Sequence, residues 1–149
     1  MNSMRMLNKN NQKMYYSMPT GNKIPVYERD EDGNIKYMFI DGVAVPVESG
    51  EYEPEYSKPV QFFNGIAGIL SKTVLKAFVI DDSSTYAQMD TLANEYPFGK
   101  GTYIWRKTEI QYKDADKTIV DVSSADYIIE NVLDEGIQFW NYLLQRTLK

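Results

Sequence analysis

The chain has 149 residues, a formal net charge of −5, and neither cysteine nor histidine. This length suits one domain with a hydrophobic core of its own. The missing residue types exclude disulfides, thiolate zinc sites and catalysis by a serine–histidine or cysteine–histidine pair. Because no apolar run approaches the roughly twenty residues of a membrane-spanning helix, we expect a protein made and kept in the cytoplasm, or in a particle assembled there, without a membrane partner.

Charge divides the chain into three parts, of which we expect residues 1–23 to be a flexible basic arm, residues 24–59 an acidic insertion and connector, and residues 60–149 a β-barrel core. The insertion carries nine acidic against three basic side chains. Cations of the arm can contact phosphate or a neighbouring protein, and the alternative is a solvated leader with no binding role. The four basic side chains of the arm are Arg5, Lys9, Lys13 and Lys23.

The acidic insertion begins with a predicted three-stranded meander. The β-rich runs "IPVYER", "IKYMFI" and "VAVPVE" are separated by turn-forming residues at 32–34 and at Asp41-Gly42. Pro46 should keep the third strand at an edge, because proline cannot donate to a sheet ladder.

The stretch "YERDEDGNIKY", residues 27–37, packs four carboxylates beside a glycine and therefore has to be tested as a calcium loop. An EF-hand loop needs glycine at its sixth position and glutamate at its twelfth. Counted from Asp30, the sixth position is Ile35 and the twelfth is Asp41, so the pattern fails. We therefore expect a solvated hairpin tip and no metal site.

The segment "GEYEPEYSKP", residues 50–59, is predicted to be an extended connector punctuated by proline. Its three glutamates recur at every second residue and would share one face of an extended chain. They cannot form a packed core.

The rest of the chain predicts short strands and one helix. Strands are expected in "PVQFFNGIAG", "TYAQMDTLA", "GTYIWRK" and "ADYIIENV", and a helix in "SKTVLKAF", with Ser71 as its N-cap. The run "IQFWNYLLQRTL" at residues 137–148 fits either a helix face or a strand. We predict a mainly β fold, a small β-barrel or sandwich with one short helix and a long acidic hairpin insertion. The predicted core residues are Phe62, Ile104, Trp105, Tyr127 and Ile129.

Carboxylates are the remaining candidates for catalysis. A glycosidase-like mechanism needs one carboxyl group in an apolar pocket that raises its pKa, and these acids lie beside turn residues and other acids. Glycine-rich phosphate loops are also missing. We therefore expect no enzymatic activity and no cofactor. The carboxylates considered are Glu51, Glu53, Glu55, Asp81, Asp82, Asp114 and Asp116.

The twelve tyrosines are spread over the whole chain. Tyrosine combines a large contact area with a polar tip, which suits protein–protein contacts. The alternative is a packed β-core with tyrosines at its edges. Stacking on single-stranded bases would require interleaved basic residues, and the tyrosine-rich insertion is acidic.

Five segments in this order resemble the small head–tail connector proteins of long-tailed double-stranded DNA phages, of the stopper or head-closure type. They are "YYS", "VYERDEDGNIKY", "YEPEYSKPVQF", "GTYIW" and "SADYIIENV". The resemblance covers most of the chain from Tyr15 onward. It implies a non-enzymatic subunit of a ring beneath the portal, at the neck of the virion, with a loop or hairpin that can narrow the DNA channel.

The resemblance implies four kinds of partner: other copies of the chain, a portal or adaptor protein, a tail terminator or tail protein, and double-stranded DNA passing without sequence specificity. Alternatives are a tail-completion or neck adaptor protein of the same machinery, and a non-viral β-barrel that binds a protein partner. We expect residues 27–37 to form the gate or a neighbour contact and "YEPEYSKP" to act as its hinge. The candidate interface and gating residues are Tyr27, Glu28, Asp30, Glu31, Asp32, Tyr37, Tyr52 and Tyr56.

Overall fold

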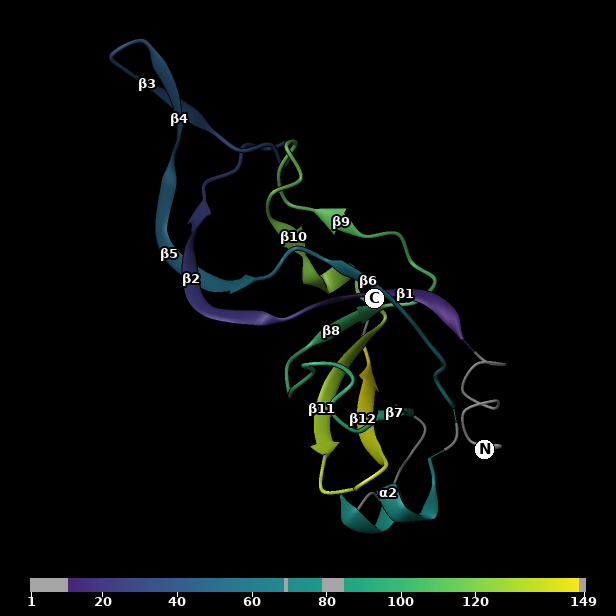
Figure 1. The fold of residues 1–149 in the computed structure, drawn as a ribbon. Helices are drawn as coiled ribbons and strands as arrows, with labels where there is room; N and C mark the ends of the chain where they lie inside the picture. The colour runs from purple at the N-terminus through teal and green to yellow at the C-terminus, as the bar shows by residue number, and fades with distance from the viewer. Residues whose placement is uncertain (1–10, 69, 79–84, 148–149) are drawn as a thin grey trace.

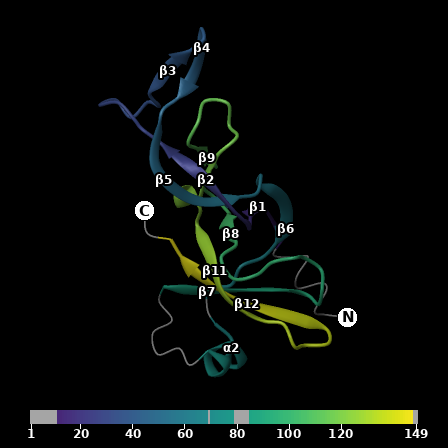
Figure 2. The same ribbon diagram turned by 90° about the vertical axis from the view of Figure 1, so that its left-hand side faces the viewer.

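A computed structural model describes residues 11–68, 70–78 and 85–147, and they form a mainly β protein with a compact part and a long extension (Figures 1 and 2). Among these residues, α2 (Lys72–Ala77) is the only α-helix, and η1 (Val122–Ser124) is a short 3-10 helix. The strands are β1 (Gln12–Ser17), β2 (Pro19–Tyr27), β3 (Tyr37–Ile40), β4 (Val43–Pro46), β5 (Glu48–Tyr56), β6 (Val60–Asn64), β7 (Tyr86–Leu92), β8 (Tyr103–Trp105), β9 (Gln111–Tyr112), β10 (Val120–Asp121), β11 (Tyr127–Leu133) and β12 (Phe139–Arg146).

The compact part is built on a six-stranded antiparallel sheet in the order β6-β1-β8-β11-β12-β7. The sheet curls until its two edges meet. Just after β6, Ala67 exchanges two backbone hydrogen bonds with Gln88 of β7, at 2.8 and 2.9 Å. Pairing the edges removes unpaired backbone groups, as closure does in barrels. The predicted mainly β fold, a small β-barrel or sandwich with one short helix, is confirmed, and the sheet is curled like half of a barrel.

The inside of the curled sheet is an apolar core with an aromatic cluster. Met14, Met89 and Leu144 are fully buried there, and Phe98 packs edge-on against Phe62 with ring centroids 5.2 Å apart. All five predicted core residues are buried. They come from β6, β8 and β11, whose β-branched and aromatic residues suit a half-buried pleated surface.

Trp105 packs in a separate cluster with Val120 and Ala125, under the β9–β10 hairpin. The indole is 1% exposed, and its Nε1 donates a 2.9 Å hydrogen bond to the hydroxyl of Ser124. The polar atom of the side chain is therefore satisfied in the buried environment, as buried tryptophan requires.

The predicted basic arm over residues 1–23 is wrong where the structure describes it. β1 lies between β6 and β8 in the main sheet, and its Met14 is fully buried. Lys13 stays exposed on this strand because successive side chains alternate between the faces of a sheet. The barrel is therefore not confined to residues 60–149. Arg5 and Lys9 lie outside the described residues.

The helix and the C-terminal strand pack against each other. Ser71 is the N-cap of α2, as predicted, and its hydroxyl accepts a hydrogen bond from the Val74 backbone. Val74 is buried against Leu143 of β12, whereas Tyr142 and Leu144 point into the barrel core. Residues 142–144 are thus buried in succession because both faces of the strand are covered. This explains why hydrophobic periodicity left the segment undecided between helix and strand.

The predicted three-stranded meander is correct for the pairing of its second and third strands and wrong for most of its first strand, of which only Arg29 bridges the second, at Ile35. β2 pairs with β5, and β3 pairs with β4, so the chain forms a long two-stranded stem that carries a second hairpin at its far end (Figure 1). The predicted turn at Asp41-Gly42 is confirmed, with positive φ angles of 51° and 81° that suit a two-residue hairpin turn.

The predicted connector at residues 50–59 is also a strand over most of its length, because β5 is half of the stem. The sequence predicted an extended segment without a pairing partner, and the structure adds the pairing with β2. In a two-stranded ribbon each strand keeps one free edge, where a proline without an N–H group costs no ladder bond.

Candidate functional site

The extension, defined here as residues 19–56, is the part of the molecule that the barrel does not enclose (Figures 1 and 2). It has three sections. The stem consists of β2 and β5, the side loop of residues 28–36, and the tip of β3, its turn and β4. Most predicted interface residues lie in the extension, but the three sections differ in the chemistry of their side chains and in their contacts with the rest of the molecule.

The side loop holds the acidic cluster that the sequence singled out. The carboxylate of Asp30 accepts hydrogen bonds from the backbone of Asp32 (3.0 Å) and Asn34 (2.9 Å), and Gly33 adopts a φ of +83°. Arg29 donates a 2.7 Å hydrogen bond to the Gly33 carbonyl. The cluster is therefore a turn closed by its own side chains. The expected hairpin turn is present, but the hairpin is short: Arg29 bridges Ile35, and the Lys36 backbone donates a 2.9 Å hydrogen bond to the Glu28 carbonyl.

The tip carries exposed apolar side chains over most of its length, and only Val45 and Pro46 at the end of β4 are half-buried. The four residues of β3 are exposed, with Phe39 at 76% of its full accessibility. Across the turn, Val43 is 62% exposed. Figure 1 places this hairpin at the end of the molecule opposite α2, where nothing else in the described chain covers it. Contiguous exposed apolar surface of this kind marks interaction sites on soluble proteins.

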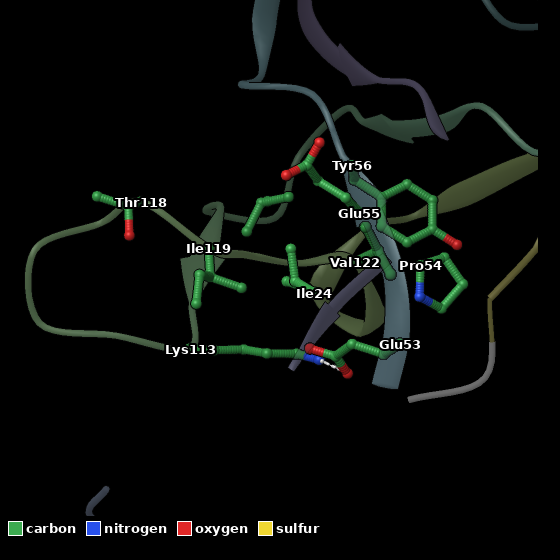
Figure 3. Close-up of a pocket in the computed structure, with 10 residues that line it drawn as sticks. Ile24, Glu53, Pro54, Glu55, Tyr56, Lys113, Thr118, Ile119 and Val122 are labelled. Atoms are coloured by element: carbon green, nitrogen blue, oxygen red, sulfur yellow. Dashed lines mark hydrogen bonds and ion pairs between the residues drawn. The ribbon is translucent and has the colours of Figure 1, made fainter. Parts of the chain in front are cut away.

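The stem is braced against the barrel by the β9–β10 hairpin. Lys113, which follows β9, forms a 2.6 Å ion pair with Glu53 of the stem (Figure 3). The Lys113 carbonyl also accepts a 2.9 Å hydrogen bond from Arg29 at the base of the side loop. One residue of the barrel therefore contacts both the stem and the side loop and fixes the angle of the extension.

A cleft of about 250 Å³ lies between the stem and this brace. Its wall combines the apolar side chains of Ile24, Ile119 and Val122 with the Lys113–Glu53 ion pair (Figure 3). The single cation in the wall is already paired with a carboxylate. Glu55 also lines the cleft, and its carboxylate accepts a 2.8 Å hydrogen bond from the Thr20 hydroxyl. The cleft therefore offers apolar packing between stem and brace beside two carboxylates, and its one cation is already paired.

The brace itself is closed by Asp114, whose carboxylate accepts hydrogen bonds from the backbone of Thr118 (3.0 Å) and Ile119 (2.9 Å) and from the Thr118 hydroxyl. Partial burial acts to raise the pKa of Asp114, but these hydrogen bonds outweigh it and hold the pKa below its ordinary value. A general acid at neutral pH needs the opposite shift.

The other carboxylates considered for catalysis do not gather at one place. Glu53 is paired with Lys113, and Glu55 accepts a 2.8 Å hydrogen bond from the Thr20 hydroxyl. Asp81 and Asp82 lie outside the described residues. Within the described part of the chain, no three acidic side chains are arranged to hold a metal ion, and no helix is long and apolar enough to cross a membrane.

The predicted interface residues are dispersed over the extension. Tyr27 is half-buried where the stem ends, and the acids of the side loop are exposed. Tyr37 opens the tip and is 58% exposed; Tyr52 is 63% exposed on the stem. Tyr56 instead packs against Tyr103 of the barrel, with ring centroids 5.4 Å apart.

The cationic candidates that the structure describes do not cluster either. Lys13 is exposed on β1 of the barrel, and Lys23 is exposed on the stem opposite Pro54. They lie on different sheets and form no common patch.

Sequence reasoning missed the apolar tip residues Met38, Phe39, Ile40 and Val43. The signal was present in the run "YMFIDGVAV", where apolar residues occupy consecutive positions and do not alternate with polar ones. Such a run indicates a strand with two apolar faces. No family model, curated protein or solved structure matches the chain.

Proposed function

We propose that the chain is a virion structural protein, a ring-forming head–tail connector of the stopper type, which joins the portal or adaptor of a DNA-filled phage head to the tail. The observation that carries the proposal is a small barrel with a braced, projecting extension that ends in exposed apolar residues. It agrees with the order of segments that resemble connector proteins. In this role the barrel is the ring body, and the extension reaches a neighbouring subunit, an adjacent ring or the DNA channel.

The negative charge of the molecule supports a role beside a channel through which DNA passes. The side loop presents Glu28, Glu31 and Asp32 to solvent, and the chain as a whole carries a net charge of −5. Acidic surface repels the phosphate backbone, so DNA can slide past without sequence-specific attachment. The proposed location is the neck of the virion, with copies of the chain, a portal or adaptor protein and a tail protein as partners.

Complementation of a phage that lacks this gene tests the function. A side-loop variant replaces four exposed acids by serine; because the barrel does not depend on them, the variant should fold normally. We expect heads that package DNA and then leak it or fail to join tails. The substitutions are Glu28→Ser, Asp30→Ser, Glu31→Ser and Asp32→Ser.

A matched control removes four exposed acids from the compact part and should leave infectivity unchanged. Fully infectious particles from the side-loop variant would mean that its acids serve only solubility. Empty heads that never packaged DNA would place the protein at an earlier assembly step and contradict the connector proposal. The control substitutions are Glu109→Ser, Asp116→Ser, Asp134→Ser and Glu135→Ser.

A further inference from the structure

The tip presents two apolar faces of different shape. In β3 and β4 the paired residues share a face, and successive residues alternate between faces. Phe39 lies opposite Ala44, and Ile40 lies opposite Val43. One face is therefore aromatic, and the other is aliphatic. The aromatic face consists of Tyr37, Phe39, Ala44 and Pro46, and the aliphatic face of Met38, Ile40, Val43 and Val45.

Neither face is covered by the rest of the described chain. Phe39 on the aromatic face is 76% exposed, and Val43 on the aliphatic face is 62% exposed. A two-stranded hairpin is at best marginally stable alone in water, and strands that are apolar on both faces are ordinarily buried on both. A flat partner surface would cover one face and leave the other in water. The tip therefore requires a partner surface on each of its two faces.

We propose that the tip packs between the tips of two neighbouring copies of this chain, with the aromatic face of each tip on the aliphatic face of the next. The inference rests on the proposed ring, since a ring places one neighbour on each side of every subunit. A contact between two different faces is heterologous, and heterologous contacts form a ring when the rotation from each copy to the next closes. In such a contact, the rings of Tyr37 and Phe39 are buried against aliphatic side chains of the next copy.

The charge pattern permits this contact between identical chains. Among residues 37–47, Asp41 at the hairpin turn is the only charged side chain. By contrast, Glu48 and Glu51 are exposed lower on the stem. Copies can thus approach closely through the tips without bringing like charges together on either packed face, while acidic stems disfavour contact along the remainder of the extension.

Cysteine cross-linking on the full chain tests the contact, because the natural sequence contains no cysteine that would interfere. Phe39→Cys places a thiol on the aromatic face, and Val43→Cys places one on the aliphatic face. Disulfides form only where the two Cα atoms approach within about 7 Å. A mixture of the two single variants at high concentration should form mixed dimers about tenfold faster than either variant alone, since packing raises the effective concentration of the second thiol.

A third variant, Lys76→Cys, controls for random collision. Lys76 is exposed on α2, at the opposite end of the molecule from the tip (Figures 1 and 2). The rate of disulfide formation between Phe39→Cys and Val43→Cys is compared with the rate between Lys76→Cys and Val43→Cys. Equal rates overturn the proposal. Fast linking of Phe39→Cys to itself also overturns it, because that result means a symmetric contact between like faces.

The outcome is distinguishable from failure of the proposed function. If the side-loop variant blocks head–tail joining while the tips do not link, the connector role stands and the packing between copies is wrong. If the tips link but the gene is dispensable for joining heads to tails, the contact stands and the connector role is wrong. Circular dichroism of each cysteine variant should match that of the wild type, which ensures that the comparison concerns folded chains.

Discussion

Two apolar strands of this molecule have opposite surroundings. In β12, Tyr142, Leu143 and Leu144 are buried in succession, because the barrel core covers one face and α2 covers the other. In β3, four consecutive apolar residues are exposed, although their composition would suit the same environment. The comparison teaches that an apolar strand with two apolar faces requires two covering layers. The described part of the chain supplies both layers to β12 and neither to β3.

The largest expected effect separates the barrel from the tip. Trp105→Ala should lower the free energy of unfolding by about 3–5 kcal/mol, because removal of a fully buried indole leaves a cavity and takes away its hydrogen bond to Ser124. Phe39→Ala, which removes a side chain of similar kind from the tip, should change it by no more than about 0.5 kcal/mol. Urea unfolding followed by circular dichroism measures both. Equal losses would contradict the division between barrel and extension.

An intermediate effect is expected when the outer extension is deleted. Tyr27 and Glu48 are paired residues of the stem, so residues 28–47 can be replaced by Asn-Gly, which forms a two-residue hairpin turn. Unfolding should remain cooperative, with a free energy within about 1 kcal/mol of the wild type, because no core residue is removed. Thermal unfolding of the shortened chain measures this. Loss of a cooperative transition would mean that the barrel needs the outer extension in order to fold.

The smallest effect concerns the brace and depends on pH. The pKa of Asp114 is held below its ordinary value, so its contribution to stability is present above that ordinary value, about 3.9, and is lost as the pH falls through the lower folded value. Asp114→Asn should destabilise the chain by less than about 1 kcal/mol at neutral pH, since the carboxylate is solvated. The difference from the wild type should shrink in acid. Urea unfolding at neutral pH and near pH 3 measures it, and a difference that grows in acid would refute this role.

The sequence alone determined several strands of the barrel, although not β1 or β12. "GTYIW" and "ADYIIENV" combine β-branched and aromatic residues with turn-formers at their ends, and Ser71 supplies a local capping signal before α2. The turn at Asp41-Gly42 was also predictable, because few residue pairs tolerate its positive φ angles. These features depend on neighbours within a few residues along the chain. Their physical causes are therefore visible in the local sequence.

Only the tertiary structure decided which strands pair with each other. "IPVYER" could pair with the next strand or, as it does, with β5 some thirty residues later, and both pairings satisfy the same backbone groups. Met14 shows the same limit, because a basic segment becomes a central strand once β6 and β8 flank it. The exposure of the apolar tip is a third feature that only the tertiary structure decided. The run "YMFI" specifies two apolar faces, but only the three-dimensional structure reveals that residues 11–68, 70–78 and 85–147 leave both of them exposed.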